Sequence, residues 1–155
     1  MPAPKINSKA PIFKGECTGD KIAHLSKLKG KKVVLYFYPK DSTPGCTTEG
    51  GDFRDLKKKF DKENTVIFGL SRESIKSHEN FKEKQNFNFE LISDPDEKIC
   101  QQYDVIKEKS MYGRKYMGID RSTFLINEKG KLVKEWRKVK VTGHAAEVLE
   151  AAKKI

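Results

Sequence analysis

Three short apolar runs, separated by polar segments, dominate the hydrophobic pattern of the chain. They are VVLYFY (33–38), TVIFGL (65–70) and STFLI (122–126). The first run is apolar at nearly every position, which is typical of a strand that is covered on both faces. We therefore expect residues 33–38 to form a central strand of a sheet.

The segments between these runs show helical spacing. Phe53, Leu56 and Phe60 recur three and four residues apart, which predicts an amphipathic helix from Cys46 to about residues 63–64. Asp94 followed by Pro95 resembles an N-cap with proline in the first turn of a helix that contains Ile99, Cys100 and Tyr103. The remaining expected elements are helices at 74–85 and 145–154, strands at 65–71, 89–93, 121–127 and 131–138, and a hairpin turn at 128–130.

Strands and helices thus alternate and finish in a hairpin and a helix. This order predicts an α/β domain with a central mixed β-sheet flanked by helices. The succession βαβ followed by ββα is the thioredoxin-like arrangement. A chain of 155 residues without linkers or repeats fits a single domain over residues 1–155.

The charge balance gives a net charge of +10, from 32 lysines and arginines against 22 acidic residues. The lysines are interleaved with acids, as in KKKFDKE, so we interpret them as a solvated surface and expect neither nucleic acid nor membrane as a partner. No apolar run approaches the length of a membrane span or a signal peptide. We expect a cytoplasmic protein.

The three cysteines, Cys17, Cys46 and Cys100, form no C-x-x-C pair, which argues against a disulfide scaffold and against a zinc site. Cys46 lies at the junction of the central strand and a helix, where unpaired backbone N–H groups favour a thiolate. The alternative is a cysteine of the core. Thr43 could hold a polar substrate against the sulfur or cap the helix.

The segment PKDSTPGC contains Pro39, Thr43 and Cys46 in the spacing P-x-x-x-T-x-x-C. This spacing resembles the peroxiredoxin signature. Together with VVLYFYPKD, DFRDL, ISDPD, GIDRSTFLI and VKVTGHAAEVLEA, it is similar to the bacterioferritin comigratory protein, or peroxiredoxin Q, subfamily over nearly the whole chain.

The resemblance implies a thioredoxin fold and a peroxidatic Cys46 whose thiolate attacks a hydroperoxide and becomes a sulfenic acid, without metal, haem or another cofactor. It implies that Thr43 orients the peroxide, that Pro39 shields the pocket and that Arg121 holds the thiolate and the transition-state oxygens. Glu49 would support the arginine, although an acid in a first helical turn is also ordinary dipole matching. Without the resemblance, Arg121 would be interpreted as a surface strand residue.

Many members of this subfamily carry a resolving cysteine five residues after the peroxidatic one, where this chain has Gly51. Cys100 is the possible resolving cysteine in the body of the fold, and its alternative is a buried core residue. Cys17 is interpreted as an incidental thiol. The sequence leaves open a one-cysteine cycle and a Cys46–Cys100 cycle.

The pair Gly50–Gly51 weakens the helix by about 1 kcal/mol per glycine relative to alanine. We expect either that this promotes unwinding, so that Cys46 reaches a distant thiol, or that small residues allow close packing there.

The leading interpretation is a thiol peroxidase that reduces hydrogen peroxide and organic hydroperoxides. Its reductant would be thioredoxin, glutaredoxin or a small thiol, and the resemblance implies a monomer or weak dimer. A general thiol-disulfide oxidoreductase is the alternative enzyme, but CTTE lacks the second sulfur. An oxidant-sensing binding module is suggested by the charge alone.

Overall fold

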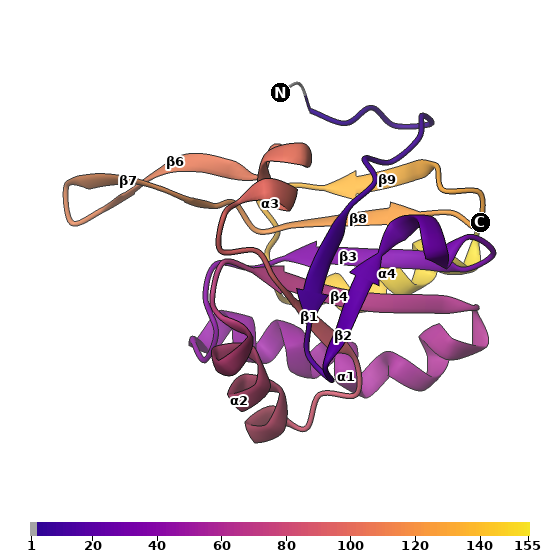
Figure 1. Cartoon of the computed structure of the whole chain (residues 1–155), viewed down its shortest axis with the longest axis horizontal. Helices are drawn as coiled ribbons and strands as arrows, with labels where there is room; N and C mark the ends of the chain where they lie inside the picture. Colours follow the sequence, from indigo (N-terminus) through magenta and orange to yellow (C-terminus); the bar gives the residue numbers. More distant parts are fainter. Residues whose placement is uncertain (1–2) are drawn as a thin grey trace.

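A seven-stranded sheet with the order β2-β1-β5-β4-β3-β8-β9 organises the computed structural model, which describes residues 3–155 (Figure 1). Its centre is β3 (Lys32–Phe37), which is parallel to β4 (Thr65–Ser71) and antiparallel to β8 (Ser122–Ile126). The flanking strands are β5 (Glu90–Ser93), β9 (Leu132–Trp136), β1 (Lys14–Cys17) and β2 (Lys21–His24). Every residue of β3 is buried, as the continuous apolar run predicts.

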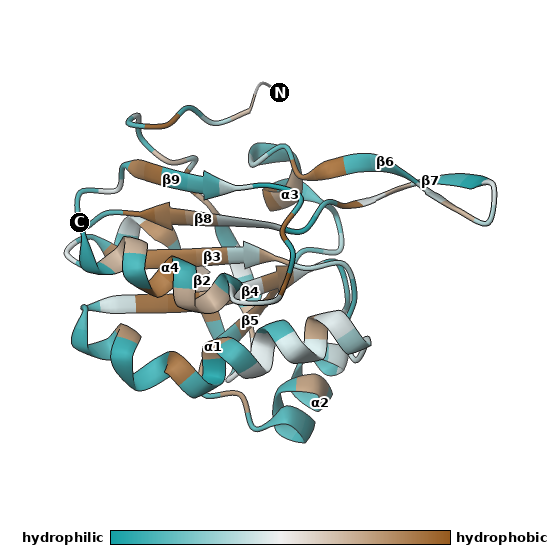
Figure 2. Ribbon diagram, turned by 180° about the vertical axis from the view of Figure 1, so that it is seen from behind, coloured by the Kyte–Doolittle hydropathy of each residue, from teal (hydrophilic) through white to brown (hydrophobic). Residues whose placement is uncertain are grey.

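The two faces of the sheet carry separate hydrophobic cores because successive strand residues point to opposite sides. Val34 and Tyr36 of β3 pack in the core beneath the three longer helices, whereas Val33, Leu35 and Phe37 pack in the core on the other face. The longer helices are α1 (Pro44–Lys62), α2 (Ile75–Gln85) and α4 (His144–Lys153). Figure 2 shows α1 and α4 in front of the apolar central strands, with hydrophilic residues along the outer side of α1.

The observed connections confirm the predicted mixed sheet. The units β3-α1-β4 and β8-β9-α4 supply the βαβ and ββα halves of the thioredoxin-like arrangement. The first half places a loop and the N-terminus of α1 at the carboxyl end of β3. Ligand and reaction sites of open α/β sheets form at such strand ends.

The helix predicted after Asp94 and Pro95 differs from the expectation. It is the short α3 (Lys98–Gln102), and its N-cap residue Glu97 has a left-handed backbone with φ of +61°. The Asp94 carboxylate still caps the helix, because it accepts hydrogen bonds from the backbone N–H groups of Ile99 and Cys100. Pro95 therefore lies in the turn before the helix and not in its first turn.

A second sheet, formed by β6 (Ile106–Met111) and β7 (Arg114–Ile119), was not among the predicted elements. Tyr112 and Gly113 both have positive φ, as a two-residue hairpin turn requires. The hairpin projects away from the main sheet (Figure 1), and most of its side chains are exposed or half-buried. A short 3-10 helix, η1 (Leu25–Leu28), follows β2.

Across residues 3–155, the helices are all too short or too polar to cross a bilayer.

Candidate active site

Cys46 lies in the first turn of α1, directly after the loop that leaves β3. Its side chain packs in the core beneath the helices, and only 2% of the residue is exposed. The N-terminal turn of a helix directs unpaired backbone N–H groups and a partial positive charge toward such a group. The backbone therefore supplies the electrostatic environment that the sequence predicts for a reactive thiolate.

Arg121 lies beside this sulfur, although 75 residues separate them in the chain. The register of β8 on β3 pairs Ser122 with Phe37 and so places Arg121 next to the loop that leads to α1. Its Nη2 lies 3.4 Å from the Cys46 Sγ. Gly45 permits this approach, because a Cβ on that residue would lie 3.3 Å from the same nitrogen.

Glu49, one helical turn after Cys46, holds the other side of the guanidinium. Its Oε1 accepts a hydrogen bond from Arg121 Nη1 at 2.5 Å. Within residues 3–155, its Oε2 is buried and has no hydrogen-bond partner. Burial raises the pKa of Glu49 to about 7, against the opposing effect of the Arg121 charge.

Thr43 is the N-cap residue of α1, but its side chain makes no capping hydrogen bond in the part of the chain that the structure describes. Its hydroxyl instead donates to the backbone oxygen of Lys40 at 2.8 Å. A hydroxyl that donates in this way keeps lone pairs that can accept a hydrogen bond from a protonated peroxide oxygen. Pro39, half-buried, lies at the start of the same loop.

Lys109 of β6 is a basic residue near this site that the sequence did not single out. Burial lowers the pKa of its ammonium group, the charges of Arg121 and Arg72 lower it further, and the negative groups of Asp120 and Cys46 oppose them. The hairpin thus adds a half-buried lysine whose pKa is affected by the charge of Arg121. Nothing in the sequence distinguishes Lys109, because it is one lysine among many in a basic chain and belongs to no motif.

The two glycines after Glu49 have different surroundings. A Cβ on Gly50 would overlap the ring of Phe87, so this position requires close packing. A Cβ on Gly51 would meet only the guanidinium of Arg54, 3.4 Å away, which is an ordinary contact. The packing explanation therefore holds for Gly50, and the expectation of a weakened helix remains for Gly51 alone.

The other two cysteines lie in the core on the opposite face of the sheet from Cys46. Cys100 is fully buried, and burial together with the nearby Asp94 carboxylate raises the pKa of its thiol. Cys17 ends β1 and is also buried. The structure therefore brings Pro39, Thr43, Cys46, Glu49 and Arg121 to one end of β3, and it places Cys100 elsewhere.

This arrangement can perform one kind of chemistry well. A buried sulfur beside a guanidinium and a helix N-terminus is a nucleophile in an environment that stabilises negative charge on the attacking and departing atoms. The hydroxyl of Thr43 adds a group that can accept a hydrogen bond from a polar molecule.

Comparisons with known proteins agree with this chemistry. A model of the AhpC/TSA family matches residues 6–135. Peroxiredoxin Bcp of Xanthomonas campestris is 60% identical over 124 residues, which are 80% of this chain and 78% of the relative. Peroxiredoxin Bcp of Bacillus subtilis is 50% identical over 149 residues, which are 96% and 95% of the two chains.

Solved structures show the same relationship. A PrxQ mutant from Xylella fastidiosa superposes with a TM-score of 0.93 at 43% identity and covers 99% of this chain and 98% of its own. The Xanthomonas campestris bacterioferritin comigratory protein superposes with a TM-score of 0.87 at 53% identity, over 92% and 90% of the two chains. The chain therefore belongs to the AhpC/TSA family and, within it, to the bacterioferritin comigratory protein, or peroxiredoxin Q, group of thiol peroxidases.

Proposed function

We propose that Cys46 is the peroxidatic cysteine and that it reduces hydrogen peroxide and organic hydroperoxides. The observation that carries this proposal is the 3.4 Å contact between Arg121 Nη2 and the Cys46 Sγ at the N-terminus of α1. A guanidinium and a helix terminus at one sulfur favour the thiolate, which is the reactive form. The Xanthomonas campestris relative is described as having alkyl peroxide reduction activity, which supports the inclusion of organic hydroperoxides.

The reaction begins with attack of the thiolate on the nearer oxygen of the hydroperoxide. The S–O bond forms as the O–O bond breaks, so the sulfur loses two electrons and the peroxide gains them. The departing oxygen takes a proton and leaves as water or an alcohol, while Cys46 becomes a sulfenic acid. Arg121 stabilises the negative charge that moves from sulfur to oxygen during this step.

The surrounding residues position these groups. Thr43 accepts a hydrogen bond from the peroxide, because its own proton is directed to the Lys40 backbone. Glu49 fixes the direction of the Arg121 guanidinium through its bond to Nη1. Pro39 restricts the loop that forms the wall of the pocket.

An external thiol completes the cycle. Cys46 and Cys100 lie in the cores on opposite faces of the sheet, so a bridge between them requires more than a local rearrangement of α1. A thiol of thioredoxin, glutaredoxin or a small molecule condenses with the sulfenic acid and releases water, and a second thiol then reduces the mixed disulfide. We propose this one-cysteine cycle for a monomer or weak dimer in a reducing compartment such as the cytoplasm.

Peroxide consumption by the full chain tests the proposal. Hydrogen peroxide and an alkyl hydroperoxide are supplied with each class of thiol, and wild type is compared with Cys46→Ser and Cys100→Ala. We expect Cys46→Ser to abolish consumption and Cys100→Ala to retain it. Consumption that persists in Cys46→Ser would refute the assignment, and a Cys46–Cys100 bridge in peptide maps of the oxidised protein would refute the one-cysteine cycle.

A further inference from the structure

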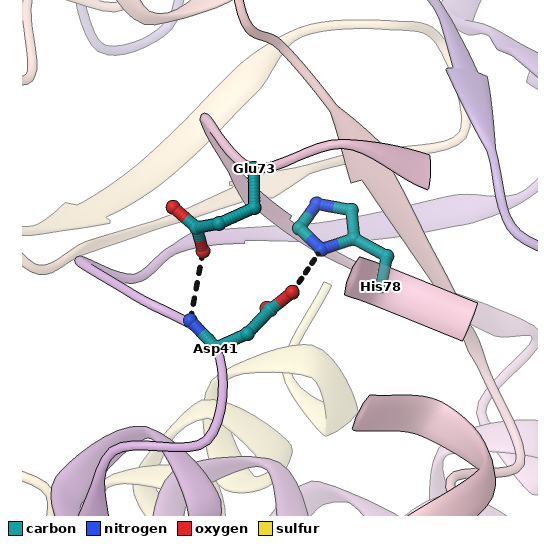
Figure 3. A group of neighbouring side chains, drawn as sticks. All are labelled: Asp41, Glu73 and His78. Carbon is teal, nitrogen blue, oxygen red and sulfur yellow. Dashed lines mark hydrogen bonds and ion pairs between the residues drawn. The ribbon is translucent and has the colours of Figure 1, made fainter. Parts of the chain in front are cut away.

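Asp41, Glu73 and His78 form a cluster next to the active-site loop, outside the group of residues around Cys46 (Figure 3). Asp41 belongs to the loop between β3 and α1, Glu73 precedes α2, and His78 lies on α2. Their potential ligand atoms lie within 4.8 Å of one another, and His78 is fully buried. The hydrogen bonds of the cluster decide what it does.

The ring of His78 contacts an oxygen acceptor at each nitrogen. Its Nδ1 lies 2.6 Å from Asp41 Oδ2, and its Nε2 lies 2.9 Å from the backbone oxygen of Ile92. A backbone oxygen cannot donate a hydrogen bond, and an ionised carboxylate accepts only. Both contacts are hydrogen bonds only if both ring nitrogens bear a proton, and the ring is then positively charged.

The Asp41 carboxylate has the matching environment for a negative charge. It accepts hydrogen bonds from the Tyr38 hydroxyl at 2.6 Å, the Ser77 hydroxyl at 2.7 Å and the His78 ring. Burial alone would raise the pKa of Asp41, but these donors and the His78 charge bring it below its ordinary value. A buried carboxylate with three donors remains ionised.

The backbone of Asp41 is held as well. Its N–H donates to Glu73 Oε1 at 2.7 Å, and the same oxygen accepts from the Ser71 hydroxyl at 2.7 Å. Glu73 Oε1 and Asp41 Oδ2 each already accept two hydrogen bonds from protein donors, and a protonated imidazole nitrogen cannot ligate. We therefore interpret the cluster as an internal network and not as a metal site.

We infer that His78 is an imidazolium in a buried ion pair with Asp41, and that this pair is a positioning device for the peroxidase reaction. It anchors one end of the active-site loop to α2 and, through Ile92, to β5. Asp41 lies two residues before Thr43 and five before Cys46, so its displacement would move both groups relative to Arg121, which is held on β8. This inference rests on the proposed reaction of Cys46 with peroxide.

The anchor also defines where the loop can open. Asp41 is buried, whereas Ser42 is exposed and has a left-handed backbone with φ of +63°. Unwinding of the first turn of α1, which frees oxidised Cys46 for an external thiol, would then end at Asp41. After reduction, the fixed residue returns the loop to the same geometry.

Nitrogen NMR of the His78 side chain tests the charge directly. In the wild type at neutral pH, we expect both ring nitrogens to carry a proton. In Asp41→Asn, we expect only Nε2 to carry one, because the asparagine amide can donate to an unprotonated Nδ1. A neutral ring in the wild type, or a doubly protonated ring in Asp41→Asn, would overturn the ion pair.

Two rate measurements on Cys46 test the positioning role. We expect His78→Asn to lower the second-order rate constant with hydrogen peroxide by about 10-fold to 100-fold, the cost of small misplacements in an active site. Alkylation of Cys46 by iodoacetamide, at a pH high enough to ionise the thiol in both proteins, should stay close to the wild-type rate, because it then depends neither on Arg121 to form the thiolate nor on the peroxide contact of Thr43. A partly unfolded variant would instead change both rates together.

His24→Asn is the matched control, because His24 lies in β2 with Ser26 as its hydrogen-bond partner, and its peroxide rate should equal that of the wild type. A folded His78→Asn protein with a wild-type peroxide rate would overturn the positioning role. If His78→Asn does not fold, Asp41→Asn decides by the same two rates. A wild-type protein that does not consume peroxide would instead refute the proposed function itself.

Discussion

The proposed chemistry of the Cys46 sulfur depends on groups brought from two segments of the chain. The first turn of α1 supplies backbone N–H groups, and Arg121 supplies a cation from the residue before β8. Arg121 Nη2 acts on the sulfur from 3.4 Å in a buried site, where such interactions are much stronger than in water. Removal of one donor should therefore have a large effect on rate and a small effect on fold.

Arg121→Lys tests the guanidinium. A lysine keeps the charge, but its ammonium lacks the planar fork that contacts the Cys46 sulfur and the Glu49 carboxylate together. We expect the rate constant with peroxide to fall by about 100-fold, the usual cost of one transition-state donor. Stopped-flow kinetics measure it, and Arg114→Lys on the exposed hairpin is the control; equal rates in both variants would contradict the role of the fork.

Glu49 should make the protein less stable as pH rises, which is the opposite of the effect of a carboxyl group whose pKa is lowered by folding. Its pKa is about 7 in the fold, against an ordinary value of 4.5, so the unfolded chain loses this proton first as pH rises. The free energy of unfolding contributed by this residue should fall by about 3 kcal/mol between those pH values.

Chemical denaturation of wild type and Glu49→Gln across this range measures that contribution as a difference between the two proteins. The difference is needed because His144 acts in the opposite direction. Burial lowers the pKa of His144 to about 4, so its own contribution decreases as pH falls below the ordinary value of 6.5. Parallel pH profiles of the two proteins would show that Glu49 titrates normally.

At the scale of residues, the sequence suggests candidate reactive positions but does not show which positions lie together in the fold. The spacing of Pro39, Thr43 and Cys46 lies within one loop and is visible in the sequence. Arg121 could be assigned only through the family resemblance, because its contact with Cys46 depends on the register of β8 on β3. The His78 contact with Asp41 has the same origin in tertiary packing.

At the scale of elements, α1 combines a tightly packed position with a loosely packed one. Gly50 packs against the ring of Phe87, whereas Gly51 has room for a methyl group. The two glycines therefore separate the packing requirement from the effect on helix stability. Alanine should therefore lower the free energy of unfolding at position 50 and raise it at position 51.

Gly51→Ala should raise the free energy of unfolding by about 1 kcal/mol. If unwinding of α1 exposes oxidised Cys46, reduction by a protein thiol should slow by up to about fivefold, the factor that corresponds to this energy. Rapid mixing of the oxidised enzyme with thioredoxin measures the rate. Gly50→Ala is the control and should destabilise the fold, and an unchanged reduction rate in a stabilised Gly51→Ala protein would contradict the role of unwinding.

Elements with a continuous apolar run or a full helical stripe were predictable, and elements without them were not. The strand predicted at 65–71 has the observed bounds of β4, because its residues fill the core. The hairpin of β6 and β7 buries few of its side chains, so its sequence carries no strong apolar pattern. The start of α3 depends on the left-handed Glu97, which local propensity does not reveal.

At the scale of the molecule, the sheet separates Cys46 from Cys17 and Cys100. The order of strands and helices was sufficient to predict the thioredoxin-like topology, since parallel β3 and β4 require a crossover helix. The distribution of the cysteines between the two cores could not be predicted, because it depends on which face each residue occupies.

Cys100→Ala should therefore leave turnover with an external thiol unchanged, although the lost sulfur in a full core will lower stability. Cys17→Ala should behave in the same way. Steady-state peroxide consumption with a saturating reductant measures this. Loss of turnover in Cys100→Ala alone, with normal formation of the sulfenic acid, would show that Cys100 resolves the oxidised enzyme.

The most direct measurement is the fate of the Cys46 sulfur after one equivalent of hydrogen peroxide without reductant, followed by intact mass and peptide mapping with a sulfenic-acid trap. The account predicts that a single oxygen, trapped as the adduct, appears on Cys46 while Cys17 and Cys100 remain thiols. An unmodified Cys46, or oxidation that is spread evenly over the three cysteines, would contradict it.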